Sequence, residues 1–300
     1  MPRLCSRCFL LVLFFLPTNL ILLSKARAVD PKYLLFYGNS FTNACCGATG
    51  SLRPMPTVVA EIAQAAGHPK PYVKNAAVNG QSMQWHVDNN TFAITSGIPG
   101  QHWSNVVLQD FSTQPTHIGN LALHLSSTTA MYNLVAAHSP NVVPVLFETW
   151  ARGPGHSFYT GVNPSFPGGP VQMQQELRDG YHMAVDNINS MVGSNLAKYA
   201  PAGDAWENAG FPLNFYASDI YHANNRGMLL NALIMYGTIY DDRTTSDINL
   251  SAILATLNVS AADGQFLQSL ADATLVPEPT TLAMVGFGVL LMTRRRRRLD

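Results

Sequence analysis

Short runs of consecutive apolar residues recur through the middle of the 300-residue chain, with segments of helical periodicity between them. Strands that are hydrophobic throughout are typical of parallel sheets, because helices cover both faces of such sheets. We therefore predict an α/β fold, with three layers (α/β/α) around a central, mostly parallel sheet. The predicted strands are 32–37, 72–78, 105–108 and 141–147, and the predicted helices are 57–66, 121–137, 172–196 and 228–239.

The start of the chain, residues 1–28, has the pattern of a secretory signal peptide. Arg3 and Arg7 precede an apolar run, and an Ala-Arg-Ala sequence ending at Ala28 fits the usual cleavage site. An uncleaved anchor is the alternative, although Pro17 interrupts the apolar run.

The end of the chain, residues 276–300, combines a Val-Pro-Glu-Pro sequence, an apolar stretch over 282–292 and five arginines from Arg294 to Arg298. The apolar stretch is short, because a full membrane span needs about 20 residues. The arginine cluster is expected to stay cytoplasmic. The order and spacing resemble the PEP-CTERM sorting signal, and a plain tail anchor is the alternative. The resemblance implies an exosortase-type sorting enzyme as partner, in Gram-negative bacteria that often make exopolysaccharide.

Together the two ends predict an exported protein. Its tail is expected to hold it in the inner membrane through a short transmembrane helix, before it reaches the periplasm, the cell surface or the extracellular matrix. Residues 29–275 then form the folded domain, and 246–275 either pack on it as helices or form a helical stalk. The chain has 18 basic and 18 acidic residues, but half of the basic ones lie in the two ends. The resulting acidic domain argues against nucleic acid as a partner.

Candidate functional residues follow the first three predicted strands, at the strand ends where functional groups gather in parallel sheets. Ser40 follows the first strand, Gly80 the second and Gln109 the third. Asp219 and His222 stand three apart near the end of the domain, just before a helix. That spacing lets the carboxylate reach the imidazole.

These residues suit nucleophilic catalysis. A serine hydroxyl is a weak nucleophile at neutral pH, so it needs a base, and the base needs an orienting acid. Ser40, His222 and Asp219 are the candidates for these three roles.

The sequence around them resembles the SGNH (GDSL-like) hydrolases. Gly38-Asn39-Ser40 is similar to the first block of that family, usually Gly-Asp-Ser, and Asp219-Ile220-Tyr221-His222 fits its last block, Asp-x-x-His. Asn79-Gly80 resembles the second block, whose glycine N–H helps to form the oxyanion hole. The resemblance spans 33–239 and implies a flavodoxin-like SGNH fold, a catalytic triad of Ser40, Asp219 and His222, and ester hydrolysis.

The third block departs from the family pattern. It is usually Gly-x-Asn-Asp, whose asparagine donates to the oxyanion, whereas this chain has Gln109-Asp110-Phe111-Ser112. We assign the missing donor to the Gln109 amide, so the expected oxyanion hole comprises the N–H groups of Ser40 and Gly80 with Gln109. A lost donor typically costs about 100-fold to 1000-fold in rate.

Other chemistries have weaker support in the sequence. Asp110 and Glu148 both stand at strand ends, and two carboxylates suit glycoside hydrolysis, but nothing in the sequence fixes their separation. The histidines outside the Asp-x-x-His motif show no ligand spacing, and no Gly-rich phosphate loop is present, so no metal or cofactor is predicted.

Cys45 and Cys46 are adjacent, and neighbouring cysteines rarely bridge because a disulfide usually needs a Cα separation of about 5.5 Å. We therefore expect two small thiols, with redox control of a site near Ser40 as the alternative.

The predicted function is that of a serine esterase that removes acyl groups, such as acetyl, from carbohydrate or another extracellular ester. A catalytically weak or inactive protein that binds surface carbohydrate is the alternative. A purely structural matrix protein is a third hypothesis, and it predicts no pocket over Ser40.

Overall fold

The computed structural model describes residues 30–97 and 100–276. The predicted signal peptide over 1–28 and the apolar stretch of the tail lie outside the described residues. Within the described ranges, none of the helices combines the length and the apolar character that a membrane crossing requires.

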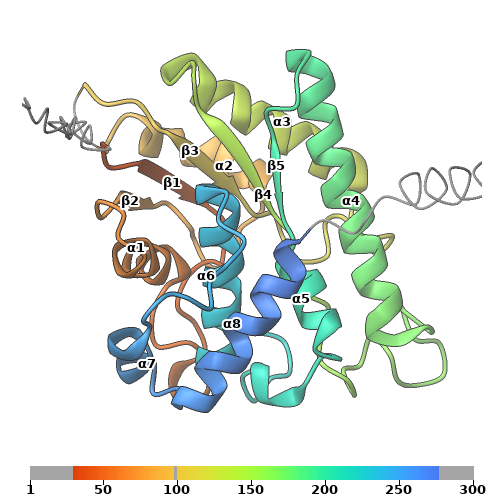
Figure 1. Cartoon of the computed structure of the whole chain (residues 1–300). Helices are drawn as coiled ribbons and strands as arrows, with labels where there is room; N and C mark the ends of the chain where they lie inside the picture. The colour runs from red at the N-terminus through yellow and green to blue at the C-terminus, as the bar shows by residue number, and fades with distance from the viewer. Residues whose placement is uncertain (1–29, 98–99, 277–300) are drawn as a thin grey trace, which may run out of the picture.

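A five-stranded sheet forms the centre of the domain, with every neighbouring pair of strands parallel (Figure 1). The strand order is β2-β1-β3-β4-β5, which is the order of the flavodoxin-like doubly wound fold. The strands are β1 (Tyr33–Tyr37), β2 (Tyr72–Asn75), β3 (Asn105–Leu108), β4 (Val143–Phe147) and β5 (Lys198–Ala200). The predicted α/β fold class and parallel sheet are confirmed.

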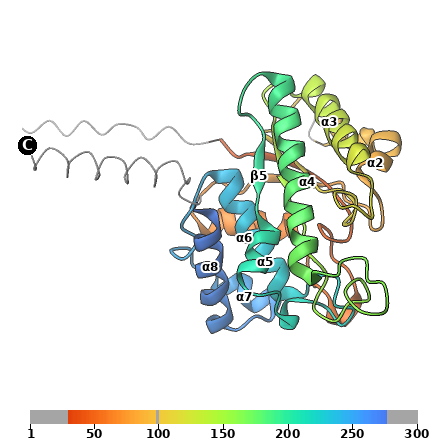
Figure 2. The same cartoon turned by 90° about the vertical axis from the view of Figure 1, so that its right-hand side faces the viewer.

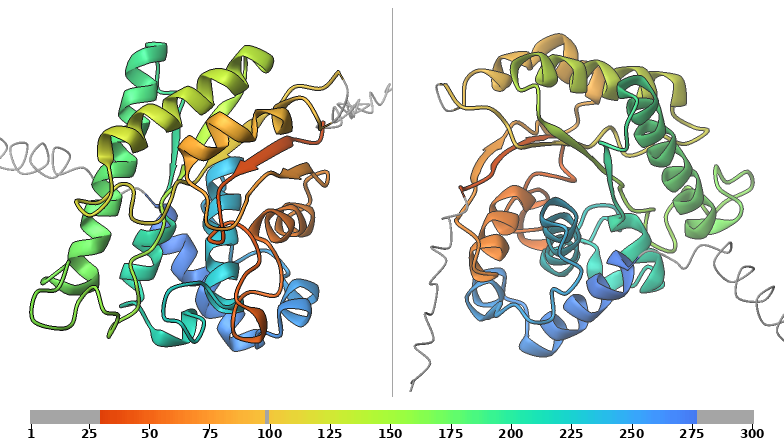
Figure 3. Two further views of the ribbon diagram at one scale, coloured as in Figure 1. Left: turned by 180° about the vertical axis from the view of Figure 1, so that it is seen from behind. Right: turned by 45° about the horizontal axis from the view of Figure 1, so that its top comes forward.

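Helices cover both faces of the sheet, which completes the three layers (Figure 3). One face packs against α1 (Met55–Ala65), α5 (Ala202–Asn208) and α6 (Asn225–Tyr240). The other packs against α2 (Met83–Asn89), α3 (Leu121–His138) and part of α4 (Gly169–Val192). Figure 2 shows α4 between α3 and α5, so this long helix closes one edge of the sandwich.

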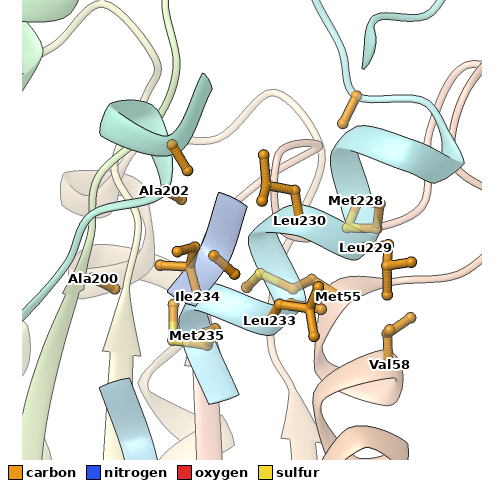
Figure 4. Close-up of a cluster of buried hydrophobic side chains, with 14 of the residues drawn as sticks. Met55, Val58, Ala200, Ala202, Met228, Leu229, Leu230, Leu233, Ile234 and Met235 are labelled. Atoms are coloured by element: carbon orange, nitrogen blue, oxygen red, sulfur yellow. The ribbon is translucent and has the colours of Figure 1, made fainter. Parts of the chain in front are cut away.

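The two faces of each strand supply two separate cores. In β1, Leu34 and Phe36 belong to the core on the α1 and α6 side, whereas Leu35 and Tyr37 belong to the opposite one. This is the two-residue alternation of a strand that is buried on both faces. Helix α6 is buried along most of its length, and Figure 4 shows its side chains meeting those of α1 and α5.

Several boundaries differ from the predicted ones for local reasons. Strand β2 ends at Asn75 instead of residue 78, although Ala76 N and Val78 N still donate to Phe36 O and Gly38 O before the chain turns at Gly80. Helix α4 ends before Gly193, whose left-handed backbone is typical of a helix C-terminus. The short elements β5, α2 and α5 were not predicted, since three to seven residues carry too little periodicity.

The last described segment packs on the domain and does not form a separate stalk. Helix α7 (Ser251–Leu257) buries Ile253 and Leu257, and α8 (Ala261–Leu275) buries Leu267 and Ala271. Helix α8 lies against α6 and α5 (Figure 1). Of the two alternatives for 246–275, the structure favours the one in which these residues extend the fold.

The strand order places a crevice at the carboxyl edge of the sheet. The chain runs from β1 outward to β2, then crosses to β3 on the other side of β1. The loops that follow β1 and β3 therefore diverge, and ligands of doubly wound folds bind at such a switch point. Ser40 follows β1 and Gln109 follows β3.

Candidate active site

The turn that carries Ser40 comes directly after β1. The amides of Thr42 and Asn43 donate to Asn39 O at 3.0 and 2.9 Å, which closes a single helical turn. Gly38 precedes it at a close approach, where a Cβ would clash with Thr42 Oγ1 and Gln109 Oε1. Glycine is therefore required there, and the tight turn leaves Ser40 partly exposed above the buried strand.

Asn39 and Gln109 hold this turn from below. Gln109 Oε1 accepts from Asn39 N at 2.8 Å and from Thr42 Oγ1 at 2.9 Å. Asn39 Nδ2 donates to Gln81 O at 3.1 Å and to Asp110 O at 3.3 Å. Both side chains are buried, so the loops after β1, β2 and β3 are joined by one hydrogen-bond network.

The loop between α5 and α6 carries Asp219 and His222. An isolated antiparallel bridge between Tyr216 and Ala223 closes this loop at its base. Gly153 N donates to Ile220 O at 2.8 Å, and Trp150 Nε1 donates to Tyr221 O at 3.1 Å. The segment that follows β4 therefore fixes the position of the loop that carries His222.

Three predicted site residues form one chain of hydrogen bonds. Ser40 Oγ lies 2.9 Å from His222 Nε2, and His222 Nδ1 lies 2.7 Å from Asp219 Oδ2. Asp219 Oδ1 also accepts from the backbone amides of Tyr221 and His222, both at 3.0 Å. The His222 side chain is 13% exposed and that of Asp219 is 40% exposed. The arrangement has the geometry of a nucleophile, a base and an orienting acid.

The pKa of Asp219 lies below its ordinary value. Partial burial acts to raise this pKa, but hydrogen bonds from the His222 side chain and from the His222 and Tyr221 amides lower it by more. The carboxylate is therefore ionised at neutral pH and can accept a hydrogen bond from the N–H group at His222 Nδ1.

The backbone N–H groups of Ser40 and Gly80 are the two backbone members of the expected oxyanion hole. Among the described residues, neither the Ser40 amide nor the Gly80 amide donates a hydrogen bond. Gly80 is exposed and has a φ of 78°, a conformation that glycine adopts without steric cost. The hydrogen bond from Asn39 to Gln81 holds the Gly80 turn against the Ser40 turn.

Gln109 does not occupy the position expected of an oxyanion donor. Its Nε2 donates to Asp110 O, its Oε1 faces Asn39 and Thr42, and its exposed fraction is 0%. The structure thus places this carboxamide under the Ser40 turn and not on its open side. The sequence motif located the residue but gave no information on which way its side chain points.

Asp110 and Glu148, the carboxylates of the glycosidase alternative, are both buried and fully engaged. Asp110 accepts from the amides of Met83 and Phe111 and contacts His124 Nδ1. Glu148 accepts from Gln174 and from the Asp204 amide, and burial raises its pKa well above the ordinary value. Carboxylates so enclosed support local structure, and neither faces an open substrate site.

Arg152 is a site neighbour that the sequence reasoning missed. Its guanidinium carbon lies 3.4 Å from the centre of the Tyr221 ring, and its Nη2 donates to Ser112 Oγ at 2.8 Å. Burial lowers its pKa to about 10, and its Nη1 has no partner among the described residues. Because Tyr221 adjoins His222, Arg152 supports the loop that carries Asp219 and His222 from the interior. The only sequence signal for it is its place after β4.

The expectation of two free thiols was wrong, since Cys45 and Cys46 form a disulfide with each other. The rule used for that expectation describes ordinary disulfides, whereas these adjacent residues have a Cα separation of 3.8 Å. Both sulfur atoms lie close to His222: one ligand atom from each of the three residues falls within 4.8 Å of the others.

A separate cavity of about 760 Å³ lies between α4, β5, α5, α6 and α8. Arg178, Lys198, Asp204 and Glu207 line part of it, and none of the triad residues does. The charged side chains in its wall are engaged in ion pairs, since Arg178 pairs with both Asp204 and Glu207.

The fold is shared with several solved structures. A DUF4886 family protein from Bacteroides uniformis aligns over 84% of this chain and 99% of its own, with a TM-score of 0.61 and 18% identity. A protein from Slackia heliotrinireducens assigned to the SGNH hydrolases aligns over 70% of this chain and 100% of its own, with a TM-score of 0.54 and 20% identity. A protein from Parabacteroides merdae described as a GDSL-like lipase aligns over 70% of this chain and 97% of its own, with a TM-score of 0.50 and 16% identity. The chain therefore has the SGNH hydrolase fold.

Residues 275–298 match the PEP-CTERM protein-sorting motif, which confirms the resemblance noted for the tail. Among curated proteins, none matches the chain significantly.

Proposed function

We propose that this protein is a serine hydrolase that cleaves ester bonds, with Ser40, His222 and Asp219 as its catalytic triad. The observation that carries the proposal is the hydrogen-bond chain from Ser40 Oγ through His222 to Asp219, on a partly exposed turn at the switch point of the sheet. The fold shared with SGNH-type proteins agrees with it.

In the proposed reaction, Ser40 Oγ attacks the carbonyl carbon of the ester while His222 Nε2 takes the hydroxyl proton. The tetrahedral intermediate collapses, and His222 returns the proton to the leaving alcohol oxygen. Water, activated in turn by His222, then attacks the acyl-serine and releases the acid. Asp219 accepts a hydrogen bond from Nδ1–H throughout, so that Nε2 of the neutral ring has a lone pair directed to Ser40 before each proton transfer.

The oxyanion would be bound by the amides of Ser40 and Gly80, neither of which has an acceptor among the described residues. Gln109 was expected to supply a third donor, and we now propose that it positions the Ser40 turn instead. A two-donor site predicts slower turnover than a three-donor site, because each such donor is worth about 100-fold to 1000-fold.

The proposed substrates are short acyl esters, such as acetyl groups on carbohydrate or on another extracellular alcohol. Support comes from the sorting motif at 275–298, since the resemblance implies export in bacteria that often make exopolysaccharide. We propose that an exosortase-type enzyme processes the tail, after the membrane has held the protein by residues 276–300.

Hydrolysis of p-nitrophenyl acetate tests the triad. Wild type should be active, and both Ser40→Ala and His222→Ala should lose about 1000-fold or more, as triad knockouts do. Ser194→Ala is the matched control, because Ser194 is an exposed serine beyond the end of α4. Equal rates in all four folded proteins would refute the proposal.

A fluorophosphonate probe separates the esterase from the alternative of a carbohydrate-binding protein without turnover. Covalent labelling of wild type that disappears in Ser40→Ala supports the enzyme. A folded protein that is not labelled, yet retains acetylated polysaccharide, would favour the binding protein.

A further inference from the structure

The Cys45–Cys46 disulfide lies beside the base of the proposed triad. The two sulfur atoms and one ring nitrogen of His222 fall within 4.8 Å of one another, and all three residues are partly buried. No part of the proposed hydrolysis uses these cysteines, so their position against His222 needs another explanation.

Contacts other than the disulfide hold the cysteine segment in place. Thr49 Oγ1 lies 3.1 Å from Ser218 Oγ, beside Asp219, and Leu52 N donates to Asn225 Oδ1 at 2.8 Å. Met55 N donates to Thr42 O at 3.0 Å, which ties the far end of the segment to the Ser40 turn. Opening the disulfide would therefore leave two thiols near His222.

Reduction changes what this cluster can bind. An external dithiol gives two electrons and two protons to the Cys45–Cys46 bond, yielding two thiols, and is itself oxidised to a disulfide. Thiolate sulfur and neutral imidazole are the ligands that zinc and related thiophilic cations prefer. Asp219 holds His222 Nδ1, so a metal would bind Nε2 and displace its contact with Ser40 Oγ.

The spacing fits a single ion. Zinc bonds of about 2.3 Å to sulfur and about 2.0 Å to nitrogen place tetrahedral ligand atoms roughly 3.5–4 Å apart. Cluster atoms within 4.8 Å reach that spacing by small side-chain movements. Asp219 would orient the histidine from behind, as carboxylates commonly do for metal-bound imidazoles.

We propose that reduced Cys45 and Cys46, together with His222, form a binding site for a thiophilic divalent cation such as Zn²⁺, and that the disulfide form lacks this site. Binding releases the two thiol protons. A cation on Nε2 takes the lone pair that would accept the Ser40 proton. Reduction in the presence of zinc would therefore switch off hydrolysis, a consequence that rests on the proposed function, whereas metal binding itself does not.

Cadmium binding tests the site directly. The full chain is prepared with Cys5→Ser and Cys8→Ser, so that no other cysteine contributes, and is kept oxidised or reduced with a phosphine. Cd²⁺ is then titrated while equilibrium dialysis and thiolate-to-cadmium ultraviolet absorption are recorded. The expected result is one Cd²⁺ per reduced chain with the absorption band, and neither in the oxidised chain or in Cys45→Ser/Cys46→Ser.

The contribution of His222 is tested in the same way. His222→Gln should weaken binding at least tenfold, and Asp219→Asn by about 10- to 100-fold, as for other residues that orient a metal-bound histidine. Equal Cd²⁺ binding by the reduced chain and by Cys45→Ser/Cys46→Ser would overturn the proposal. So would cadmium affinity that His222→Gln leaves unchanged, since the histidine would then be no ligand.

The activity arm separates this inference from the esterase proposal. If wild type hydrolyses p-nitrophenyl acetate, stoichiometric Zn²⁺ should inhibit the reduced enzyme at least tenfold more than the oxidised one, and a chelator should restore the rate. Equal inhibition of both forms would overturn the switch. If wild type is inactive, the esterase proposal fails while the cadmium titration still decides the metal site.

Discussion

Asp219 contacts His222 through both of its carboxylate oxygens: Oδ2 lies 2.7 Å from Nδ1, and Oδ1 accepts from the His222 amide at 3.0 Å. The backbone thus fixes the orientation of the carboxylate, and the carboxylate in turn fixes the orientation of the His222 ring. The Tyr221 amide is a second donor to Oδ1. Rotating the carboxylate so that Oδ1 and Oδ2 exchange positions would therefore break two backbone hydrogen bonds.

This orientation makes Asp219→Asn a sharp test. The new Oδ1 keeps the two amide donors, so Nδ2 must face His222 and donate to Nδ1. The ring then carries its proton on Nε2 and cannot accept one from Ser40. We expect kcat for p-nitrophenyl acetate to fall by about 10⁴-fold, the size of the analogous effect in the serine proteases from which that figure is taken, with KM nearly unchanged. A loss below tenfold would contradict the assigned role of Asp219.

The low pKa of Asp219 gives the same variant a pH signature. A carboxylate whose pKa is lower in the folded state stabilises the fold above its unfolded pKa, and this contribution is lost as the pH falls through the folded value. The difference in Tm between wild type and Asp219→Asn should therefore shrink as the pH drops below about 4, near the ordinary aspartate pKa. Thermal unfolding at pH 7 and at pH 3 measures it, and a difference that grows in acid would refute this reasoning.

Asn39→Asp restores the residue that is usual in the Gly-Asp-Ser block, yet we expect it to be harmful here. Asn39 Nδ2 donates to two carbonyl oxygens, Gln81 O and Asp110 O, in a position only 2% exposed. A carboxylate oxygen there would face two acceptors and lose both bonds. The expected cost is about 1–3 kcal/mol, or roughly 2–12 °C in Tm.

The matched control for this change is Asn195→Asp, at an exposed position beyond the end of α4, where the same chemical change should cost less than about 0.5 kcal/mol. Protonation lets the new carboxyl donate one hydrogen bond, so the deficit of Asn39→Asp should diminish in acid. Stability equal to wild type at pH 7 would show that the network of Asn39 tolerates the charge.

The residues that sequence could predict are those whose roles depend on short motifs. The continuous apolar runs located β1, β3 and β4, and the Gly-Asn-Ser and Asp-x-x-His motifs located Ser40, Asp219 and His222. The supports of these residues depend on contacts between distant segments. Gln109 lies beneath Asn39 only because β1 and β3 are neighbours, and Arg152 reaches Tyr221 only because the loop before α6 folds over the end of β4. No local pattern reports such contacts.

Gln109→Ala distinguishes a supporting residue from an oxyanion donor. Truncation would leave the buried Asn39 amide and the Thr42 hydroxyl without their acceptor, at a cost of about 1–3 kcal/mol for an unsatisfied buried group. We expect Tm to fall by several degrees and kcat to fall with it, because the Ser40 turn loses its brace. The exposed Gln175→Ala on α4 serves as control. A normal Tm with a kcat lowered 100-fold or more would instead return Gln109 to the oxyanion hole.

Arg152→Lys tests whether the flat stacking on Tyr221 holds the catalytic loop. A lysine keeps the positive charge but has no planar fork, so it cannot cover the ring and donate to Ser112 Oγ in the same way. Loss of a desolvated cation–π contact costs about 2 kcal/mol, and the displaced Tyr221 backbone adjoins His222.

Thermal unfolding should therefore show a lower Tm for Arg152→Lys, and the rate with p-nitrophenyl acetate should fall through kcat more than through KM. Arg243→Lys, the same exchange at an exposed position, should change neither. An unchanged Tm and kcat in Arg152→Lys would show that the position of His222 does not depend on this guanidinium. The hydrogen bonds from Gly153 and Trp150 would then be sufficient to hold the loop in place.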